Sequence, residues 1–378
     1  MKPAIAKLAG AVFALLLAWP AQAQTVTRVA TNLENPRGIA VLPDGRLLVV
    51  EAGTGFDTLD PLQHTGKLSL FEDLNGDGDY DDPGEITRIF SFLPSYNTLT
   101  RYNTGHDEIG GPGDIIVLDD GRIFITRDEA FDGIAIVEIN PDYRVRGDLI
   151  TAQGTINALA YDAGSGIIYA AESGLNRLSA VTLDGNRTVV ADFAPLAHNQ
   201  QAVPSGLALD PRTGELLVAL FSGQVIDYYG TTLSFMPGDA KIVRVDPATG
   251  AVRDEITGLT TAVDVAVDAA GNLFVVELTT RWPPAHMPRQ FDLFDPDAPP
   301  DDGGYARYSG RVTLYAADGR APVILADGLD QPTNITYHDG VLYISAGQGT
   351  PGRPIIGPNG RTSIVGEIYR ITDYLPEG

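Results

Sequence analysis

The polar residues best suited to chemistry recur at one position of a repeated sequence pattern. Each lies at or beside the start of an apolar segment with the composition of a β-strand; the four are Asp114, Asn157, Asp264 and Asn334. A ring of carboxylate and amide oxygens around one axis suits a hard cation such as Ca²⁺. The same side chains could instead bridge neighbouring strands by bonding backbone amides. A metal site and a structural role therefore both stay open.

Two further groups of residues are expected on the same side of the protein. Charged residues end the second apolar segment of four repeats and are predicted to contact a cofactor: Glu51, Arg127, Glu172 and Glu277. In the connections between strands, His106 or His286 would transfer a proton and Arg281 would hold an anionic group. Together with Asp264 these three form the predicted catalytic set. Solvated or loop-packing roles are the structural alternative.

A separate acidic segment, residues 73–85, matches the first half of a calcium-binding loop. The ligands expected at its positions one, three, five and seven are Asp73, Asn75, Asp77 and Asp79. Gly78 takes the sharp turn, while position twelve is Gly84 and the usual Glu is displaced to Glu85. Because the segment connects two strands, the predicted Ca²⁺ is structural rather than catalytic. An ordinary acidic turn is the alternative.

These residues are positioned by six copies of one unit, which is an apolar segment, a turn and a second apolar segment. The copies begin at residues 38, 114, 158, 206, 264 and 334. The segments are short, rich in β-branched and aromatic residues, and bounded by Asp-Gly, Asn or Pro, which indicates strands and hairpins rather than helices. A third strand follows in every unit, and a fourth follows in the first five.

The sixth unit ends after its third strand, and residues 26–30 at the other end of the chain supply a matching fourth strand. Pairing of these two ends would close a ring without an exposed sheet edge. The sequence therefore predicts an all-β fold, a six-bladed β-propeller closed by the N-terminal strand. An array of two-sheet β-sandwiches is the rival, but it leaves the displaced strand unexplained.

The connections differ in length between the two faces of the predicted ring. First-to-second-strand turns are short, whereas long second-to-third-strand connections occupy residues 52–66, 221–240, 278–310 and 347–366. Long connections in a compact fold are commonly functional. Their aromatic and cationic side chains would suit a planar organic ligand or a carboxylate, although they could equally pack the loops on one another. The sequence therefore predicts a small-molecule site on this face.

Composition and the first residues exclude several classes of protein. The 378 residues contain no Cys, which rules out disulfides, thiolate metal sites and cysteine nucleophiles. The net charge of −23 would repel nucleic acids and anionic membranes. Two Lys, an apolar run of about 12 residues and Ala21-Gln22-Ala23 have the form of a secretory signal too short to anchor in a bilayer. We expect a signal peptide at 1–23 and a single monomeric propeller domain at 24–378, without membrane insertion, in the periplasm or secreted.

The strand boundaries resemble those of known propellers. Asn35-Pro-Arg-Gly-Ile-Ala, Val203-Pro-Ser-Gly-Leu-Ala and Gly366-Glu-Ile-Tyr-Arg-Ile are similar to motifs of the exported propeller family of scytonemin gene clusters (ScyD/ScyE). The resemblance covers nearly the whole chain after residue 23. It implies export and six blades, and it carries over no catalytic residues.

Two more distant resemblances imply cofactors. The chain is similar to calcium-dependent lactonase and phosphotriesterase propellers (regucalcin- and paraoxonase-like), which hold a central Ca²⁺ at first-strand starts. Asn157, Asp264 and Asn334 match such positions, whereas the corresponding residues Gly113, Ser205 and Val263 depart from the pattern. Pro36-Arg-Gly-Ile-Ala also resembles quinone-dependent sugar dehydrogenase propellers. That resemblance implies a quinone, with contacts sought at His106, Arg127 and Arg281.

These features favour an exported propeller that binds a small organic substrate and hydrolyses it in a metal-assisted, lactonase-like reaction. Ca²⁺ would polarise a carbonyl while His106 or His286 moves a proton. A quinone-dependent sugar or aldehyde dehydrogenase is one alternative. A non-catalytic binding or scaffolding propeller is the other.

Overall fold

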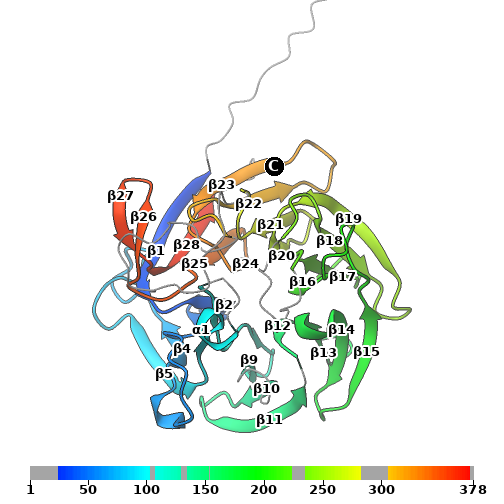
Figure 1. Ribbon diagram of the computed structural model, residues 1–378. Coiled ribbons are helices and arrows are strands. Elements are labelled where there is room, and N and C mark those ends of the chain that lie inside the picture. Colours follow the sequence, from blue (N-terminus) through cyan, green and yellow to red (C-terminus); the bar gives the residue numbers. More distant parts are fainter. Residues whose placement is uncertain are drawn as a thin grey trace, which may run out of the picture.

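The computed structural model describes residues 24–102, 107–128, 134–152, 154–223, 235–281 and 305–374. Within them, six four-stranded antiparallel sheets stand around a common axis as the blades of a ring (Figure 1). The predicted all-β six-bladed propeller is therefore confirmed. No helix in the described segments combines the length and apolar character needed to cross a bilayer.

In blades 1 to 5, the strands run from the axis outward in chain order. Blade 1 contains β2 (Pro36–Val41), β3 (Leu47–Glu51), β4 (Gly66–Phe71) and β5 (Ile86–Leu93), and blade 2 contains β8 (Ile115–Val117), β9 (Ile123–Arg127), β10 (Ile134–Ile139) and β11 (Val145–Ala152). Blade 3 contains β12 (Ile156–Asp162), β13 (Ile167–Glu172), β14 (Arg177–Thr182) and β15 (Arg187–Asp192), and blade 4 contains β16 (Pro204–Leu209), β17 (Leu216–Leu220), β18 (Ala240–Val245) and β19 (Val252–Leu259). Blade 5 contains β20 (Ala262–Val267), β21 (Leu273–Glu277), β22 (Gly310–Tyr315) and β23 (Val323–Leu329).

Blade 6 joins the two ends of the chain. It contains β24 (Asn334–His338), β25 (Val341–Ala346), β28 (Gly366–Thr372) and, as its outermost strand, β1 (Thr25–Leu33). The register of β1 against β28 pairs Val26 with Ile371 and Leu33 with Gly366. The predicted closure is thus confirmed, and the closing strand is longer than the predicted residues 26–30.

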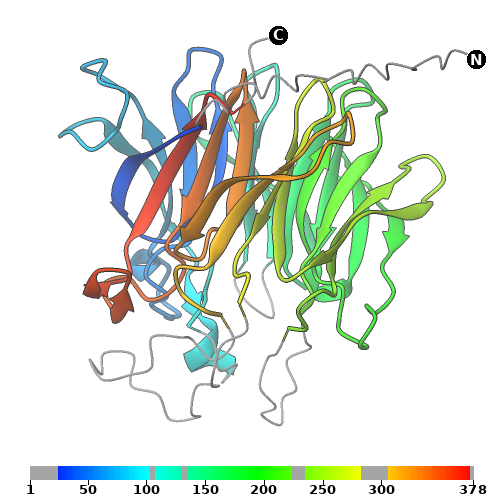
Figure 2. The same ribbon diagram turned by 90° about the horizontal axis from the view of Figure 1, so that it is seen from above.

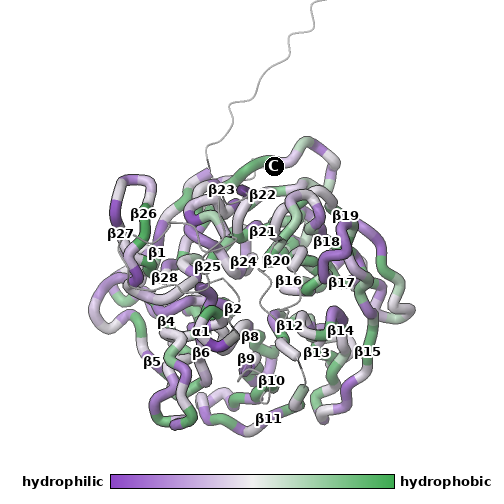
Figure 3. The backbone as a smooth tube through the Cα atoms, viewed as in Figure 1, coloured by the Kyte–Doolittle hydropathy of each residue, from purple (hydrophilic) through white to green (hydrophobic). Residues whose placement is uncertain are grey.

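The core lies between neighbouring blades, because each sheet is apolar on both faces near its middle strands. All five residues of β3, β17 and β21 are buried, whereas most of the outer strand β19 is exposed. In one inter-blade cluster, Leu48 and Val50 of blade 1 pack with Ile125 and Val137 of blade 2. Figure 3 shows the green, hydrophobic segments running through the blades. Burial of this apolar area stabilises the ring by roughly 25 cal/mol per Å².

The two faces of the ring carry different structures (Figure 2). One face, termed the loop face, carries the second-to-third-strand connections, the hairpin of β26 (Pro354–Gly357) and β27 (Gly360–Ser363), and the short helix α1 (Thr98–Tyr102). Beside α1, β6 (Tyr96–Asn97) pairs with β7 (Ile109–Gly110), and the 3₁₀ turns η1 (Pro61–Gln63) and η2 (Ser173–Leu175) complete the elements. The turn between β4 and β5 projects from the opposite face.

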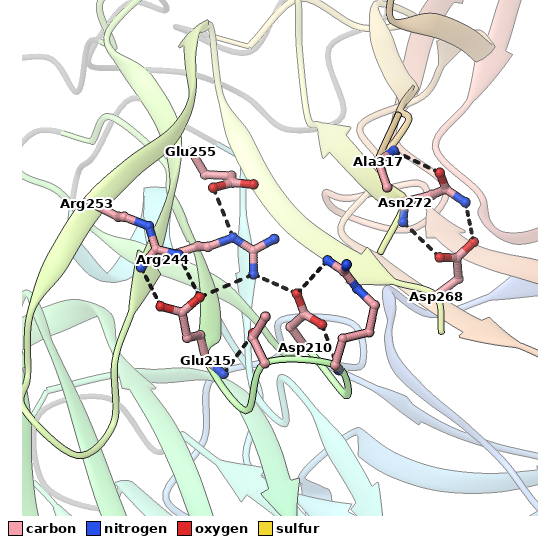
Figure 4. Close-up of polar contacts among 10 residues, drawn as sticks. Asp210, Glu215, Arg244, Arg253, Glu255, Asp268, Asn272 and Ala317 are labelled. Carbon is pink, nitrogen blue, oxygen red and sulfur yellow. Dashed lines mark hydrogen bonds and ion pairs between the residues drawn. The ribbon is translucent and has the colours of Figure 1, made fainter. Parts of the chain in front are cut away.

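On that opposite face, blade 4 is fastened by an ion-pair network (Figure 4). Arg244 Nη1 lies 2.7 Å from Asp210 Oδ2, and its Nε lies 2.9 Å from Glu255. Burial alone would raise the pKa of Asp210, but hydrogen bonds from Arg244 and from the Arg212 amide hold that pKa below its usual value. Every charge in the network has an opposite partner, so we assign the network to stability.

Candidate functional site

The predicted first-strand carboxylates connect neighbouring blades. Asp114 Oδ2 accepts the Leu159 amide of blade 3 at 2.7 Å, and its Oδ1 accepts the Ile115 amide at 2.9 Å. Asp264 Oδ2 accepts the Ile335 amide of blade 6 at 2.9 Å and the Asn334 side-chain amide at 2.8 Å. Both carboxylates are buried. These bonds show the inter-blade role that the sequence left open as the structural alternative.

Each of these two Asp residues lies against a glycine of the preceding blade. A Cβ added to Gly38 would lie 2.7 Å from the Cα of Asp114, and one added to Gly206 would lie 2.4 Å from the Cα of Asp264. The same Gly–Asp contact therefore occurs between blades 1 and 2 and between blades 4 and 5. This contact therefore repeats with approximate two-fold symmetry around the ring. In both places the missing Cβ of the glycine lets the backbones of the two blades approach closely.

We expect Gly206→Ala to destabilise the protein by about 3 kcal/mol, because the new methyl group would overlap backbone that cannot easily move. The midpoint of urea unfolding measures the effect. Gly164→Ala is the matched control, since its Cβ would meet only a side-chain oxygen of Asp162 at 3.2 Å. Equal stability of the two variants would contradict the close contact.

The two carboxylates do not present a shared ion site. Burial raises the pKa of Asp114 to about 7, against the opposing effect of its two amide bonds. Burial and then the charge of Asp114 raise the pKa of Asp264 well above its usual value. Across the described residues, no three His, Asp or Glu side chains gather closely enough to hold a metal ion. The two carboxylates thus bond neighbouring blades, and a central Ca²⁺ stays a prediction.

Asn157 and Asn334, the other two predicted ligands, are both half-buried. The Asn334 amide bonds Asp264, as described above. The side chain of Asn157 makes no hydrogen bond with any described residue. Calcium binding at the axis stays a prediction. Among the described residues, no group of three His, Asp or Glu side chains is arranged to hold the ion.

The predicted cofactor-binding residues bond the outer strands of their own blades or the connections that lead into those blades. Glu51 lies 3.3 Å from Lys67 of β4 and accepts the Glu34 amide at 2.8 Å. The remaining pairs are Glu172 with Arg177 and Arg187, Glu277 with the Thr260 amide, and Arg127 with Asp148. The structure therefore places all four within blades, and it does not bring them together around one ligand.

One of these residues borders a groove on the outside of the ring. The groove has a volume of about 450 Å³ and lies between the closing strand β1 and blade 1. Its lining includes Thr31, Glu51, Lys67, Tyr80 and Arg88. Two of its charged residues are already engaged, because Lys67 pairs with Glu51 and also with Glu34.

The predicted calcium loop folds around its own backbone amides. Asp73 accepts the amides of Gly76 at 2.6 Å and Gly78 at 2.9 Å. The loop is fixed to the closing strand, because the Tyr80 amide donates to the Val29 carbonyl at 2.7 Å. A carboxylate oxygen that accepts one amide keeps a second lone pair for a ligand. Calcium binding here stays a prediction.

If this loop binds Ca²⁺, chelation is expected to lower the melting temperature by about 5 °C, the shift from losing a ligand held at about 100 times its Kd. Scanning calorimetry in EDTA and after restoring Ca²⁺ measures it. Asp77→Asn should remove the response to Ca²⁺. A melting temperature independent of EDTA would rule out the calcium assignment.

The predicted catalytic residues are only partly placed. His106 and His286 lie outside the described residues. Arg281 is exposed at the loop face, and its guanidinium donates to the Arg307 carbonyl at 3.1 Å. None of these observations tests a catalytic role for the three residues.

The structure instead brings together charged and phenolic residues that the sequence did not single out. Four of them stand at loop-face ends of strands or in the connection that carries α1, and the fifth, Tyr305, comes from the connection between β21 and β22. Together they form the Arg37–Glu108 cluster: Arg37, Tyr96, Glu108, Asp128 and Tyr305. Arg37 Nη2 donates to the Ile109 carbonyl at 2.6 Å, and the Tyr96 hydroxyl donates to Asp128 at 3.1 Å. The side chain of Glu108 accepts no hydrogen bond from the described residues.

The charges in this cluster are poorly compensated. Burial lowers the pKa of Arg37, against the opposing charges of Glu108 and Tyr96. The pKa of Glu108 is raised, mainly by burial. The charge of Asp128 also raises this pKa, whereas the charge of Arg37 opposes the increase. Burial and the charge of Glu108 raise the pKa of Tyr305. Arg37 and Glu108 are half-buried and make no ion pair with each other.

The backbone on both sides of Glu108 is held firmly. On one side, Asp107 lies 2.7 Å from Arg353 Nε and accepts the Asn97 amide group at 2.7 Å and the Thr350 amide at 3.0 Å. On the other, the Ile109 carbonyl is bound by Arg37. The carboxylate of Glu108 is thus positioned by the scaffold while its oxygens remain available. A carboxylate positioned in this way can accept and return a proton, and the guanidinium of Arg37 can stabilise an oxyanion.

Aromatic rings stand next to this cluster. Tyr305 stacks on Phe235 with centroids 5.8 Å apart and meets Phe221 edge-on at 5.9 Å. These rings come from the second-to-third-strand connections of blades 4 and 5. These connections are among those in which the sequence predicts aromatic and cationic side chains over a small-molecule site. Arg37 is not one of the cations of that prediction, and ligand binding at the loop face stays a prediction.

Comparisons with known proteins identify the fold and not a family. No family model matches the chain, and no curated protein matches it. Similar solved structures include a protein of unknown function from Bacteroides thetaiotaomicron, with 12% identity over 93% of this chain and 76% of that chain and a TM-score of 0.52. A streptogramin B lyase shares 13% identity over 92% and 97% of the two chains, with a TM-score of 0.50.

A third similar structure is a Thermus thermophilus protein described as a putative oxidoreductase (glucose dehydrogenase). It shares 15% identity over 92% of this chain and 99% of that chain, with a TM-score of 0.51. At such identities the likeness shows the propeller fold alone. The propellers that resemble this chain thus include proteins described as a lyase and a dehydrogenase, so the fold does not select a reaction.

Proposed function

We propose that this protein is an exported propeller enzyme that binds a small organic molecule at the loop face and hydrolyses it by lactonase-like acid–base chemistry. The supporting observation is the Arg37–Glu108 pair: two opposite charges that alter each other's pKa without forming an ion pair. Partly buried charges left in this state can be completed by a bound ligand.

The proposed reaction opens a lactone or a related ester with water. Ionised Glu108 takes a proton from the water molecule while the water oxygen forms a bond to the carbonyl carbon. Arg37 stabilises the negative charge that develops on the carbonyl oxygen. When the ring C–O bond breaks, protonated Glu108 gives the proton to the leaving oxygen. The product is a hydroxycarboxylic acid, and the Glu108 carboxylate is restored.

This assignment differs from the predicted roles of His106, His286 and a channel Ca²⁺, which stay predictions. The two histidines lie outside the described residues, and the oxygens of Asp114 and Asp264 are occupied by blade-to-blade hydrogen bonds. Arg37 and Glu108 offer a charged pair at the same end of the ring, so both parts of the chemistry can be assigned to described residues.

Export and kinship with the scytonemin-cluster propellers belong to the same proposal. The signal-like residues 1–23 and the strand-boundary motifs support them. Sequencing the N-terminus of protein recovered from outside the cytoplasm tests export, and Gln24 is the expected first residue. A chain that keeps residues 1–23 would contradict cleavage.

A panel of lactones and aryl esters, followed with a pH indicator, tests the reaction class. We expect acid release with at least one lactone. The matched arm supplies pyrroloquinoline quinone, glucose and an electron-accepting dye. Dye reduction in the quinone arm, with no acid release from any lactone or ester in the first arm, would favour the dehydrogenase alternative. Activity in neither arm would favour a binding or scaffolding propeller.

A further inference from the structure

We propose that the Arg37–Glu108 site binds a small hydroxycarboxylate, with the carboxylate on Arg37 and the hydroxyl group donating to Glu108. This inference rests on the proposed function, since it names the ligand chemistry of the same site. It follows from the unused donors of Arg37, the unused acceptors of Glu108 and the lack of an ion pair between these two residues.

Arg37 has donors to spare. A guanidinium has five N–H donors, and one hydrogen bond from the Arg37 guanidinium, to the Ile109 carbonyl, occurs among the described residues. That bond fixes the plane of the group at the start of β2. A guanidinium held in this way is suited to two parallel hydrogen bonds with a carboxylate.

Glu108 has acceptors to spare. Its carboxylate is half-buried and receives no hydrogen bond from the described residues. The charges that act on it are those of Arg37 and Asp128. A ligand group beside the Glu108 carboxylate must therefore donate a hydrogen bond. An acceptor group there would leave both the carboxylate and the ligand group desolvated without a hydrogen bond.

A ligand that bridges both groups carries an anion at one end and a donor at the other. A neutral hydroxyl fits the donor position better than an ammonium group, because Arg37 would repel a second cation at short range in these poorly hydrated surroundings. A dianion is excluded for a similar reason, since Glu108 and Asp128 already carry negative charge near the site. The hydroxycarboxylate also matches the product of lactone opening.

The aromatic rings suggest the apolar part of a useful probe. Tyr305 lies near Glu108, and the charge of Glu108 contributes to the raised pKa of Tyr305. The Tyr305 ring also packs with Phe235 and Phe221. Mandelate combines a carboxylate, a hydroxyl and a ring in one small molecule. Mandelamide removes its charge, phenylacetate removes its hydroxyl, and phenylglycine replaces the hydroxyl with ammonium.

Isothermal titration of the full mature chain with these four compounds tests the proposal. We expect mandelate to bind at least about tenfold more tightly than each of the other three, the ratio typical of one charge-assisted hydrogen bond. Arg37→Gln should erase the preference over mandelamide, while Arg37→Lys should keep part of it. Glu108→Gln should reduce the preference over phenylacetate.

Arg88→Gln is the control, because Arg88 is exposed on β5 at the outside of the ring. Its preferences should equal those of the unmodified protein. Equal binding of mandelate and mandelamide, tighter binding of phenylglycine, or preferences unmoved by Arg37→Gln would each overturn the proposal. If no compound binds but Glu108-dependent lactone hydrolysis is found, the ligand assignment fails and the proposed function stands. If mandelate binds as expected without any hydrolysis, the proposed reaction fails instead.

Discussion

Replacing Glu108 by Gln is expected to lower kcat at least about 100-fold for any lactone that the protein hydrolyses. The amide keeps the size of the side chain but cannot accept the proton of the attacking water, and a positioned general base contributes about 100- to 10,000-fold. Because the side chain of Glu108 makes no hydrogen bond to the described residues, the fold should survive the change. Steady-state kinetics and the melting temperature of the same preparation measure both effects.

The pH dependence of turnover gives this prediction a second readout. The base must be ionised, so activity should fall as pH drops through the pKa of Glu108, which burial raises above its usual value. Asp128→Asn removes a negative neighbour and should move this acidic limb to lower pH, whereas Arg37→Gln removes a positive one and should move it to higher pH. Full activity of the Glu108→Gln variant would rule out Glu108 as the base. So would an acidic limb of the pH profile that moves to higher pH in Asp128→Asn or to lower pH in Arg37→Gln.

Replacing Arg353 by Leu is expected to destabilise the protein by about 3–5 kcal/mol. Arg353 and Asp107 are both buried, and removal of one partner leaves the other charge buried without compensation. The unfolding midpoint in urea should fall accordingly. Since Asp107 precedes Glu108, the variant should also lose activity before it unfolds.

The matched control for this substitution is Arg320→Leu. Arg320 pairs with Asp318 at 3.1 Å, but both side chains are largely exposed, so solvent screens the pair and little change is expected. Equal unfolding midpoints for the two variants would show that the buried pair does not anchor the α1 connection. Loss of stability without loss of activity would separate the anchor from the position of Glu108.

The blades were predictable because each unit carries its own signals. Paired apolar runs such as residues 38–51 and 264–277 indicate both strands and the turn between them, and the displaced strand at 26–30 indicates the closure. The structure confirms these features in sheet order and register. Local periodicity and turn chemistry are sufficient for this level of structure.

The site was less predictable because it depends on where connections lie in space. The histidines drew attention in the sequence, while Glu108 stood two residues beyond His106 and Arg37 stood directly before Gly38. Nothing in their spacing shows that the β6–β7 excursion returns Glu108 towards the first strand of blade 1. Conversely, Asp114 and Asp264 had the right type and spacing for a metal site, yet their oxygens bond the amides of adjoining blades.

The placement of β1 in blade 6 also constrains how the protein can be made. Ribosomes synthesise this strand near the start of the chain, whereas β28 emerges among the last residues. Strand β1 therefore lacks its neighbour in the sheet until β28 has been made, and the unfinished blade keeps an open edge until then. Native closure must then wait until β28 is available to pair with β1.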